Sequence, residues 1–93
     1  MNDEKKNYGK VQNVYSIYDR VVEEYSYPFC STNHNSAVRQ FTTSISRSPE
    51  MGLNKRDYSL RYVAQFDMET GEMSAVEIEI VFEGEMFKKE TEK

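Results

Sequence analysis

Residues 58–83 read YSLRYVAQFDMETGEMSAVEIEIVFE, and this stretch decides the fold. In its first part, apolar or aromatic residues stand at positions 58, 60, 62, 64 and 66, the period of two typical of a strand with one buried face. In its last part, glutamates alternate with a second apolar series, which predicts a returning strand that buries Val76, Ile78, Ile80 and Phe82. Between them, Asp67 opens a turn and Gly71 supplies a left-handed conformation. The stretch therefore predicts an antiparallel hairpin.

A helix is predicted upstream of this hairpin, where residues 31–48 read STNHNSAVRQFTTSISRS. The apolar residues recur at helical spacing and form one stripe: Val38, Phe41 and Ile45. Several residues before the stripe are candidate N-caps, namely Ser31, Thr32, Asn33, Asn35 and Ser36. The polar residues that point away from the stripe are Arg39, Gln40, Thr43 and Arg47. We expect about three turns, ended by Pro49 and followed by a loop at Gly52 and Asn54.

The N-terminal part predicts one further strand and the start of another. Residues 11–18 read VQNVYSIY, rich in β-branched and aromatic side chains that favour a strand. Tyr27 precedes Pro28 and is therefore extended, which indicates a reversal and a short second strand around residues 28–31. Together the elements predict an α+β domain, with one helix packed on a small, mainly antiparallel sheet of three to four strands. We expect a flexible lead-in at 1–10, the domain at 11–83 and a charged, frayed tail at 84–93.

Composition excludes several classes of protein. The chain has 93 residues, enough for one small core, and its seven Tyr and five Phe are too many large apolar groups for a disordered chain. One Cys and one His exclude a disulfide scaffold and a multi-cysteine zinc site. The longest apolar runs are two residues, so the sequence predicts no membrane span and no export signal.

The net charge of −4 argues against a nucleic-acid partner, but its distribution matters more than its sum. Residues 1–10 carry one net positive charge, residues 11–67 carry none, and residues 68–93 carry five net negative charges. The acidity is therefore confined to the C-terminal end, and the rest of the chain can gather positive charge on one face.

Catalytic and metal-binding interpretations find little support. Cys30 and His34 are four residues apart and could form a thiolate–imidazole pair, but a buried Cys and a surface His near a helix start are the favoured alternative. No glycine-rich phosphate loop is present. The glutamates of residues 76–83 could bind a divalent cation, although a solvated strand face explains them as well. We expect no enzyme activity, no cofactor and no metal.

Basic and aromatic residues together suggest a nucleic-acid surface. Sheets that bind single strands use aromatic rings for base stacking and basic side chains for phosphate. The candidate binding residues are Arg20, Arg39, Lys55, Arg56, Arg61, Tyr18 and Tyr62, with Tyr15 as a further aromatic candidate. The alternative is that Tyr15 and Tyr62 only fill the core of a domain without Trp.

Several segments in order resemble the small nonstructural protein of gokushovirus-like microviruses, which are tailless phages with single-stranded circular DNA. The matching segments are residues 15–20 (YSIYDR), 28–29 (PF), 36–41 (SAVRQF), 57–67 (DYSLRYVAQFD) and 70–71 (TG). The resemblance covers about residues 13–72. It implies a DNA-binding, non-capsid protein linked to the single-stranded stage of genome replication or packaging.

The matched residues are Asp19, Pro28, Phe29, Arg39, Phe41, Phe66, Asp67 and Gly71. Arg39 points away from the helix stripe and Arg20 lies just beyond a strand, so these two are favoured as functional. The glutamate-rich C-terminal part lies outside the resemblance and argues against binding driven by charge alone.

The sequence therefore predicts a non-catalytic phage protein that binds single-stranded DNA in the host bacterial cytoplasm, as a homodimer or higher oligomer. The alternative is an interaction module that engages a viral or host replication or packaging protein, such as the replication initiator or capsid precursor, through its sheet edge or aromatic surface. Convergence of the five basic residues on one face would favour the first function. If they scatter and each pairs with a carboxylate, DNA binding loses its physical basis.

Overall fold

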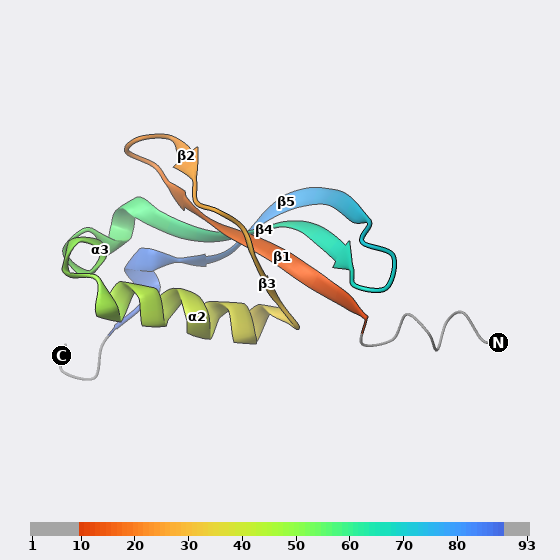
Figure 1. Ribbon diagram of the computed structural model, residues 1–93. Helices are drawn as coiled ribbons and strands as arrows, with labels where there is room; N and C mark the ends of the chain where they lie inside the picture. The colour runs from red at the N-terminus through yellow and green to blue at the C-terminus, as the bar shows by residue number, and fades with distance from the viewer. Residues whose placement is uncertain (1–9, 89–93) are drawn as a thin grey trace.

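A computed structural model describes residues 10–88 and shows one antiparallel sheet with a long helix against one of its faces (Figure 1). The strands are β1 (Val11–Asp19), β2 (Glu24–Tyr25), β3 (Phe29–Ser31), β4 (Tyr58–Asp67) and β5 (Met73–Glu83). The helices are α2 (His34–Arg47) and α3 (Pro49–Leu53), with single 3₁₀ turns η1 (Lys55–Asp57) and η2 (Gly84–Met86). The predicted α+β fold is confirmed.

The sheet has five strands, where three to four were predicted, because the chain after the first reversal pairs with β1 in two pieces. The strand order is β2-β1-β4-β5, and β3 pairs with β1 farther along the edge that β2 occupies. Tyr18 lies opposite Tyr25, and Val14 lies opposite Cys30. Between the two pieces lies Tyr27-Pro28, where Pro28 has no N–H to donate to a ladder. A proline therefore separates β2 from β3.

The core lies between α2 and the sheet. Ala37, Phe41 and Ile45 of the helix are buried against Tyr15 and Leu60. The predicted stripe is thus confirmed at two positions, with Ala37 buried and Val38 only half-buried. The loop predicted after Pro49 is wrong, because residues 49–53 form a helix.

A second short helix, α3, begins at Pro49 instead. Pro49 occupies the first helical position, where a missing N–H has no cost, and the Ser48 hydroxyl caps the helix by accepting from the Met51 N–H at 3.2 Å. At the start of α2, the Asn33 side chain accepts from the Ser36 N–H at 2.8 Å. One of the five predicted caps is therefore the residue used.

The predicted burial of β5 is wrong in its middle. Ile78 and Ile80 are 51% and 48% exposed, whereas Phe82 packs against the core. The register between β4 and β5 shifts between Leu60 and Arg61, so that Leu60 lies opposite Phe82 but Arg61 lies opposite Ile80. This irregularity turns Phe82 toward α2 and leaves Ile80 on the face that α2 does not cover.

The predicted tail begins with a folded turn. Gly84 is buried, and a Cβ added there would lie 2.8 Å from the Tyr58 carbonyl oxygen and closer still to that of Lys55. The Lys55 ammonium donates to the Phe87 carbonyl at 2.6 Å. Residues 1–9 of the predicted lead-in and residues 89–93 of the predicted tail lie outside the described residues.

Candidate nucleic-acid interface

Strand alternation gives the sheet two faces of different character. Tyr15, Ile17 and Leu60 point toward α2 and belong to the core. Their neighbours Ser16, Tyr18, Ser59 and Arg61 point to the opposite side, which we call the open face because no helix covers it (Figure 1). Ser16 and Ser59 are buried, so of these four side chains Tyr18 and Arg61, both half-buried, are the ones that a ligand of the sheet would meet.

Tyr18, Tyr25 and Arg61 form a compact group on the open face, the tyrosine–arginine cluster. The rings of Tyr18 and Tyr25 lie side by side from paired positions on β1 and β2, with centroids 4.7 Å apart. The Arg61 guanidinium carbon lies 4.2 Å from the centre of the Tyr18 ring and 5.9 Å from that of Tyr25. These distances are those of cation–π contacts.

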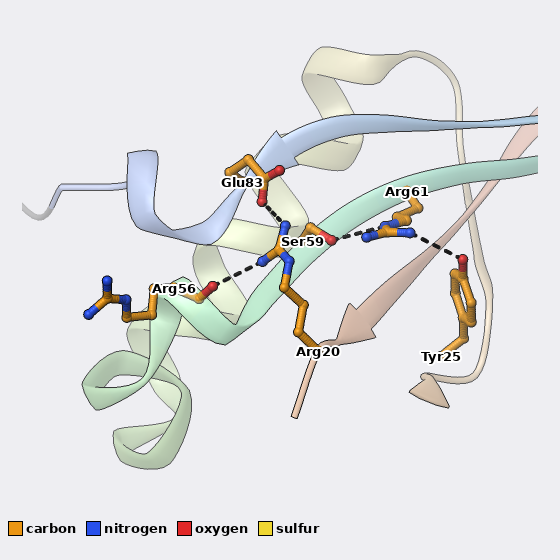
Figure 2. A network of polar contacts seen from close by, with 6 residues as sticks. All are labelled: Arg20, Tyr25, Arg56, Ser59, Arg61 and Glu83. Atoms are coloured by element: carbon orange, nitrogen blue, oxygen red, sulfur yellow. Dashed lines mark hydrogen bonds and ion pairs between the residues drawn. The ribbon is translucent and has the colours of Figure 1, made fainter. Parts of the chain in front are cut away.

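Hydrogen bonds fix the Arg61 guanidinium in place (Figure 2). Its Nε–H donates to the Ser59 hydroxyl at 3.0 Å, and an Nη1–H donates to the Tyr25 hydroxyl at 3.4 Å. A guanidinium has five N–H donors, and the other three, including both on Nη2, have no partner among the described residues. A planar cation is therefore held with part of its donor edge available to a ligand.

Arg20 and Arg56 lie beside this cluster at the end of β1 (Figure 2). The Arg20 guanidinium forms an ion pair with Glu83 and donates to the Arg56 carbonyl at 2.9 Å. The Arg56 side chain points away from the sheet, and its guanidinium has no hydrogen bond or ion pair with any described residue. Of the two, Arg56 is the one whose charge is not already neutralised.

The remaining predicted site residues lie elsewhere. Arg39 is exposed on α2, on the other side of the sheet, where it lines a hollow with Asn33, Asn35 and Ser36. Lys55 lies over the Phe87 ring, 5.7 Å from its centre. The five basic residues therefore do not converge on one face, and the convergence that would favour DNA binding is absent. Arg61 is on the open face, Arg56 is at its margin, and Arg20, also at the margin, is paired with Glu83.

Tyr15 and Tyr62 lie on the helix side of the sheet. Tyr15 is fully buried, and its hydroxyl bonds to His34 Nδ1 at 2.7 Å and accepts from Asn13 Nδ2 at 3.0 Å. The Tyr62 ring contacts both Tyr15 and His34, with centroids 5.6 and 5.2 Å away. Burial raises the pKa of Tyr15 above its ordinary value. The structure gives both tyrosines packing roles and places neither on the open face.

Cys30 and His34 make no contact of the kind that a catalytic pair requires. Cys30 was expected to be buried, but it is exposed on β3. His34 was expected at the surface, and it is half-buried and hydrogen-bonded to Tyr15. Within residues 10–88, no group of three His, Cys, Asp or Glu side chains could hold a metal ion. Across the same residues, no helix is long and apolar enough to cross a membrane.

Tyr25 and Ser59 were missed by the sequence reasoning. Tyr25 lies in a segment that is polar on average, and it reaches the cluster only because Glu23 adopts a left-handed conformation, φ 62°, which reverses the chain onto β1. Ser59 could have been predicted from the alternation of β4, because it stands two residues before Arg61 and therefore on the same face. Tyr27, 95% exposed beyond β2, is a further aromatic side chain that the prediction did not include.

A shallow hollow of about 250 Å³ adjoins the cluster on the open face. Tyr25, Val63 and Ile78 supply most of its apolar lining, with Ser16, Ser26 and Pro28. A planar ring could enter it beside the Tyr25 side chain. The open face thus combines an oriented cation, aromatic rings and an apolar recess.

Comparison with known proteins places the chain in a protein family. The family model described as Phage ORF5 protein matches residues 12–87. Neither a curated protein nor a solved structure matches the chain. The match includes all the strands and helices described above except Val11, the first residue of β1.

Proposed function

The chain belongs to the phage ORF5 protein family, and from this premise and the tyrosine–arginine cluster we propose that it binds single-stranded DNA through the open face of its sheet. The observation that carries the proposal is the position of Arg61, stacked on Tyr18 and hydrogen-bonded to Ser59 and Tyr25. Stacking and hydrogen bonding reduce the entropy that this long side chain would lose on binding a phosphate or a base.

The arrangement supports binding of unpaired bases better than binding of a duplex. Unpaired bases stack on aromatic rings and on arginine planes, and each such contact contributes about 1–3 kcal/mol. Tyr25, Tyr27 and the exposed side of the Arg61 plane offer such surfaces, and the hollow beside Tyr25 can receive a ring. Bases inside a duplex are stacked on each other and cannot reach these surfaces.

Because side chains alternate between the two faces of a strand, not every glutamate of β5 lies on the open face. Glu79 of β5 lies on the helix side, with its carboxylate 3.8 Å from His34 Nε2. Glu83 lies at the margin of the open face, but it is paired with Arg20. Neither of these two carboxylates therefore forms an ion pair with Arg61.

We extend the proposal to the role of the protein. The sequence resemblance to gokushovirus-like microviruses favours a non-catalytic protein that acts in the host bacterial cytoplasm, at the single-stranded stage of genome replication or packaging. A homodimer would place two tyrosine–arginine clusters on one strand, and linked sites bind more tightly than either site alone.

The test is fluorescence-anisotropy titration of the full chain against a labelled single strand of about 30 nucleotides and the matching duplex, at several salt concentrations. Each phosphate contact contributes about −0.7 to the slope of log K against log salt for a single strand. With contacts from Arg61 and Arg56 alone, we expect a slope of about −1.5 per protomer and a preference for the single strand.

Two variants decide whether the open face is responsible. Arg61→Ala should weaken binding about 5- to 150-fold, the range expected from one lost stacking contact, and Arg61→Lys should restore only part of it, because lysine keeps the charge but not the plane. Arg47→Ala is the matched control, since it removes an exposed cation from the last turn of α2. Equal losses in the Arg61 and Arg47 variants, or no binding at low salt, would overturn the proposal.

A further inference from the structure

The outer edge of β5 presents backbone groups that no described strand pairs. β5 has eleven residues and stands at the end of the strand order, bonded on one side to β4. At about 3.4 Å per residue this edge is roughly 37 Å long. Unpaired N–H and C=O groups along such an edge are a template for another strand.

This edge lacks three of the features that prevent strand addition. Natural edges are shortened, interrupted by proline, lined with lysine, or bent by bulges. β5 is long and contains neither proline nor lysine, but its register against β4 shifts at two places, between Leu60 and Arg61 and between Tyr62 and Ala64. Ile78 and Ile80 are about half exposed on it, and Met73 is 56% exposed. The only charges on β5 are three glutamates, Glu77, Glu79 and Glu83.

The glutamates disfavour pairing between two copies of β5. In an antiparallel pair around a two-fold axis centred on Glu77 or on Glu79, that glutamate lies opposite its own copy. Centring the pair on Ile78 sets Glu77 opposite Glu79, and centring it on Ile80 sets Glu77 opposite Glu83. Like charges directly opposite each other destabilise a strand pair. In these four registers, which centre the pair on the middle of β5, a second copy of this chain is therefore a poor occupant of the edge.

The same glutamates favour a basic strand from another protein as the binding partner. Glu79 has a side chain that is 57% exposed, and its carboxylate lies 3.8 Å from His34 Nε2. Glu77 has no ion pair within residues 10–88. Opposite-charge pairs across neighbouring strands stabilise a sheet, as do apolar pairs. Lysine or arginine opposite the glutamates and apolar residues opposite Ile78 and Ile80 would match both series.

We propose that the outer edge of β5 binds an extended segment of another protein in which lysine or arginine alternates with β-branched apolar residues. The backbone of the segment completes the ladder, and its basic side chains give the specificity. The backbone groups of this edge lie on the side of β5 away from β4, whereas the tyrosine–arginine cluster lies on β1, β2 and β4. Ile78 also lines the hollow beside Tyr25, so the two proposals share this side chain and differ in their backbone and charge contacts.

A labelled, end-capped peptide of about nine residues, a typical strand length, with alternating lysine and valine, is the probe. We expect salt-sensitive binding by anisotropy with the full chain, and slower amide exchange in β5 by NMR, with β1 unchanged. The same peptide carrying N-methyl groups on alternate residues keeps its charge but loses ladder donors, and it should bind at least about tenfold more weakly. Equal binding of the methylated peptide, or no protection of β5, would overturn the proposal.

Variants test the charge match. The double variant E77K/E79K should bind the lysine peptide at least about tenfold more weakly and should bind an alternating glutamate–valine peptide instead. E69K/E72K is the matched control, because it changes the net charge equally and both glutamates are exposed between β4 and β5. Arg61→Ala should leave peptide binding unchanged, which separates this proposal from that of DNA binding. A loss as large in E69K/E72K as in E77K/E79K would refute a role for the edge glutamates.

Discussion

Replacing Tyr15 with Phe removes one hydroxyl at the centre of the fold and keeps the ring. That hydroxyl joins His34 of α2 to Asn13 of β1 through bonds of 2.7 and 3.0 Å. Each such bond contributes about 1 kcal/mol net. The side chains of His34 and Asn13 are only half-buried, so water can reach the groups left behind. We therefore expect Tyr15→Phe to lower the free energy of unfolding by about 2 kcal/mol, measured by urea denaturation at neutral pH.

The same variant has a pH signature. Burial raises the pKa of Tyr15 above its ordinary value near 10, so on raising the pH the unfolded chain loses this proton before the folded one does. The stability that this provides is complete below about pH 10 and is lost as the pH rises through the folded pKa. Tyr15→Phe should therefore show a smaller alkaline loss of stability, though not none, because burial also raises the pKa of Tyr58.

Tyr25→Phe is the control, because its hydroxyl is exposed and makes one long bond of 3.4 Å to Arg61. It should change the unfolding free energy by less than about 0.5 kcal/mol. Equal stability of Tyr15→Phe and the unmodified chain, with the same alkaline profile, would refute the assignment of the hydroxyl as a link between helix and sheet.

Two further variants test the chain end and the Arg20 ion pair. Gly84→Ala should lower the free energy of unfolding by about 2–3 kcal/mol, because its methyl group would meet backbone carbonyl oxygens, including that of Lys55. Thermal denaturation tests this, and a midpoint equal to that of the unmodified chain would contradict it. Glu83→Gln releases Arg20 and should cost less than about 1 kcal/mol, since the pair is about one third exposed. If single-stranded DNA binds the open face, Glu83→Gln should tighten binding more than Glu69→Gln does, as anisotropy can show; equal effects would mean that only net charge matters.

Much of the fold follows from the sequence because its periodic segments are long. The period of two in residues 58–66, the turn at Asp67–Gly71 and the stripe of Phe41 and Ile45 each have a direct physical meaning, and all are present. The turn behaves as its residues require, with the Asp67 side chain accepting from the Glu69 N–H at 2.9 Å and Gly71 at φ 81°. The exposure of Ile78 and Ile80 could not be predicted. It depends on a shift in the register of β5 against β4, and the alternation of polar and apolar residues in the sequence does not reveal that shift.

The candidate site was only partly predictable for a similar reason. Tyr18 and Arg61 could be chosen by residue type, but their contact depends on the register of β1 against β4, which pairs Ser16 with Arg61 and Tyr18 with Ser59. Tyr62 is next to Arg61 in the chain and points to the other side of the sheet. Composition identifies which residue types are available, whereas register decides which of them meet.

Because β1 pairs with β4, which follows much later in the chain, the tyrosine–arginine cluster can form only late in translation. β1 pairs with β4 over its whole length, from Val11 opposite Asp67 to Asp19 opposite Tyr58. A nascent chain that has emerged from the ribosome only as far as α2 can form the β1–β2 reversal, with Tyr18 beside Tyr25, but it has no Arg61 to complete the cluster. Contacts between segments this far apart in the chain form slowly, whereas β4 and β5 are joined by a short turn. The tyrosine–arginine cluster therefore stays incomplete until the second half of the sheet has docked.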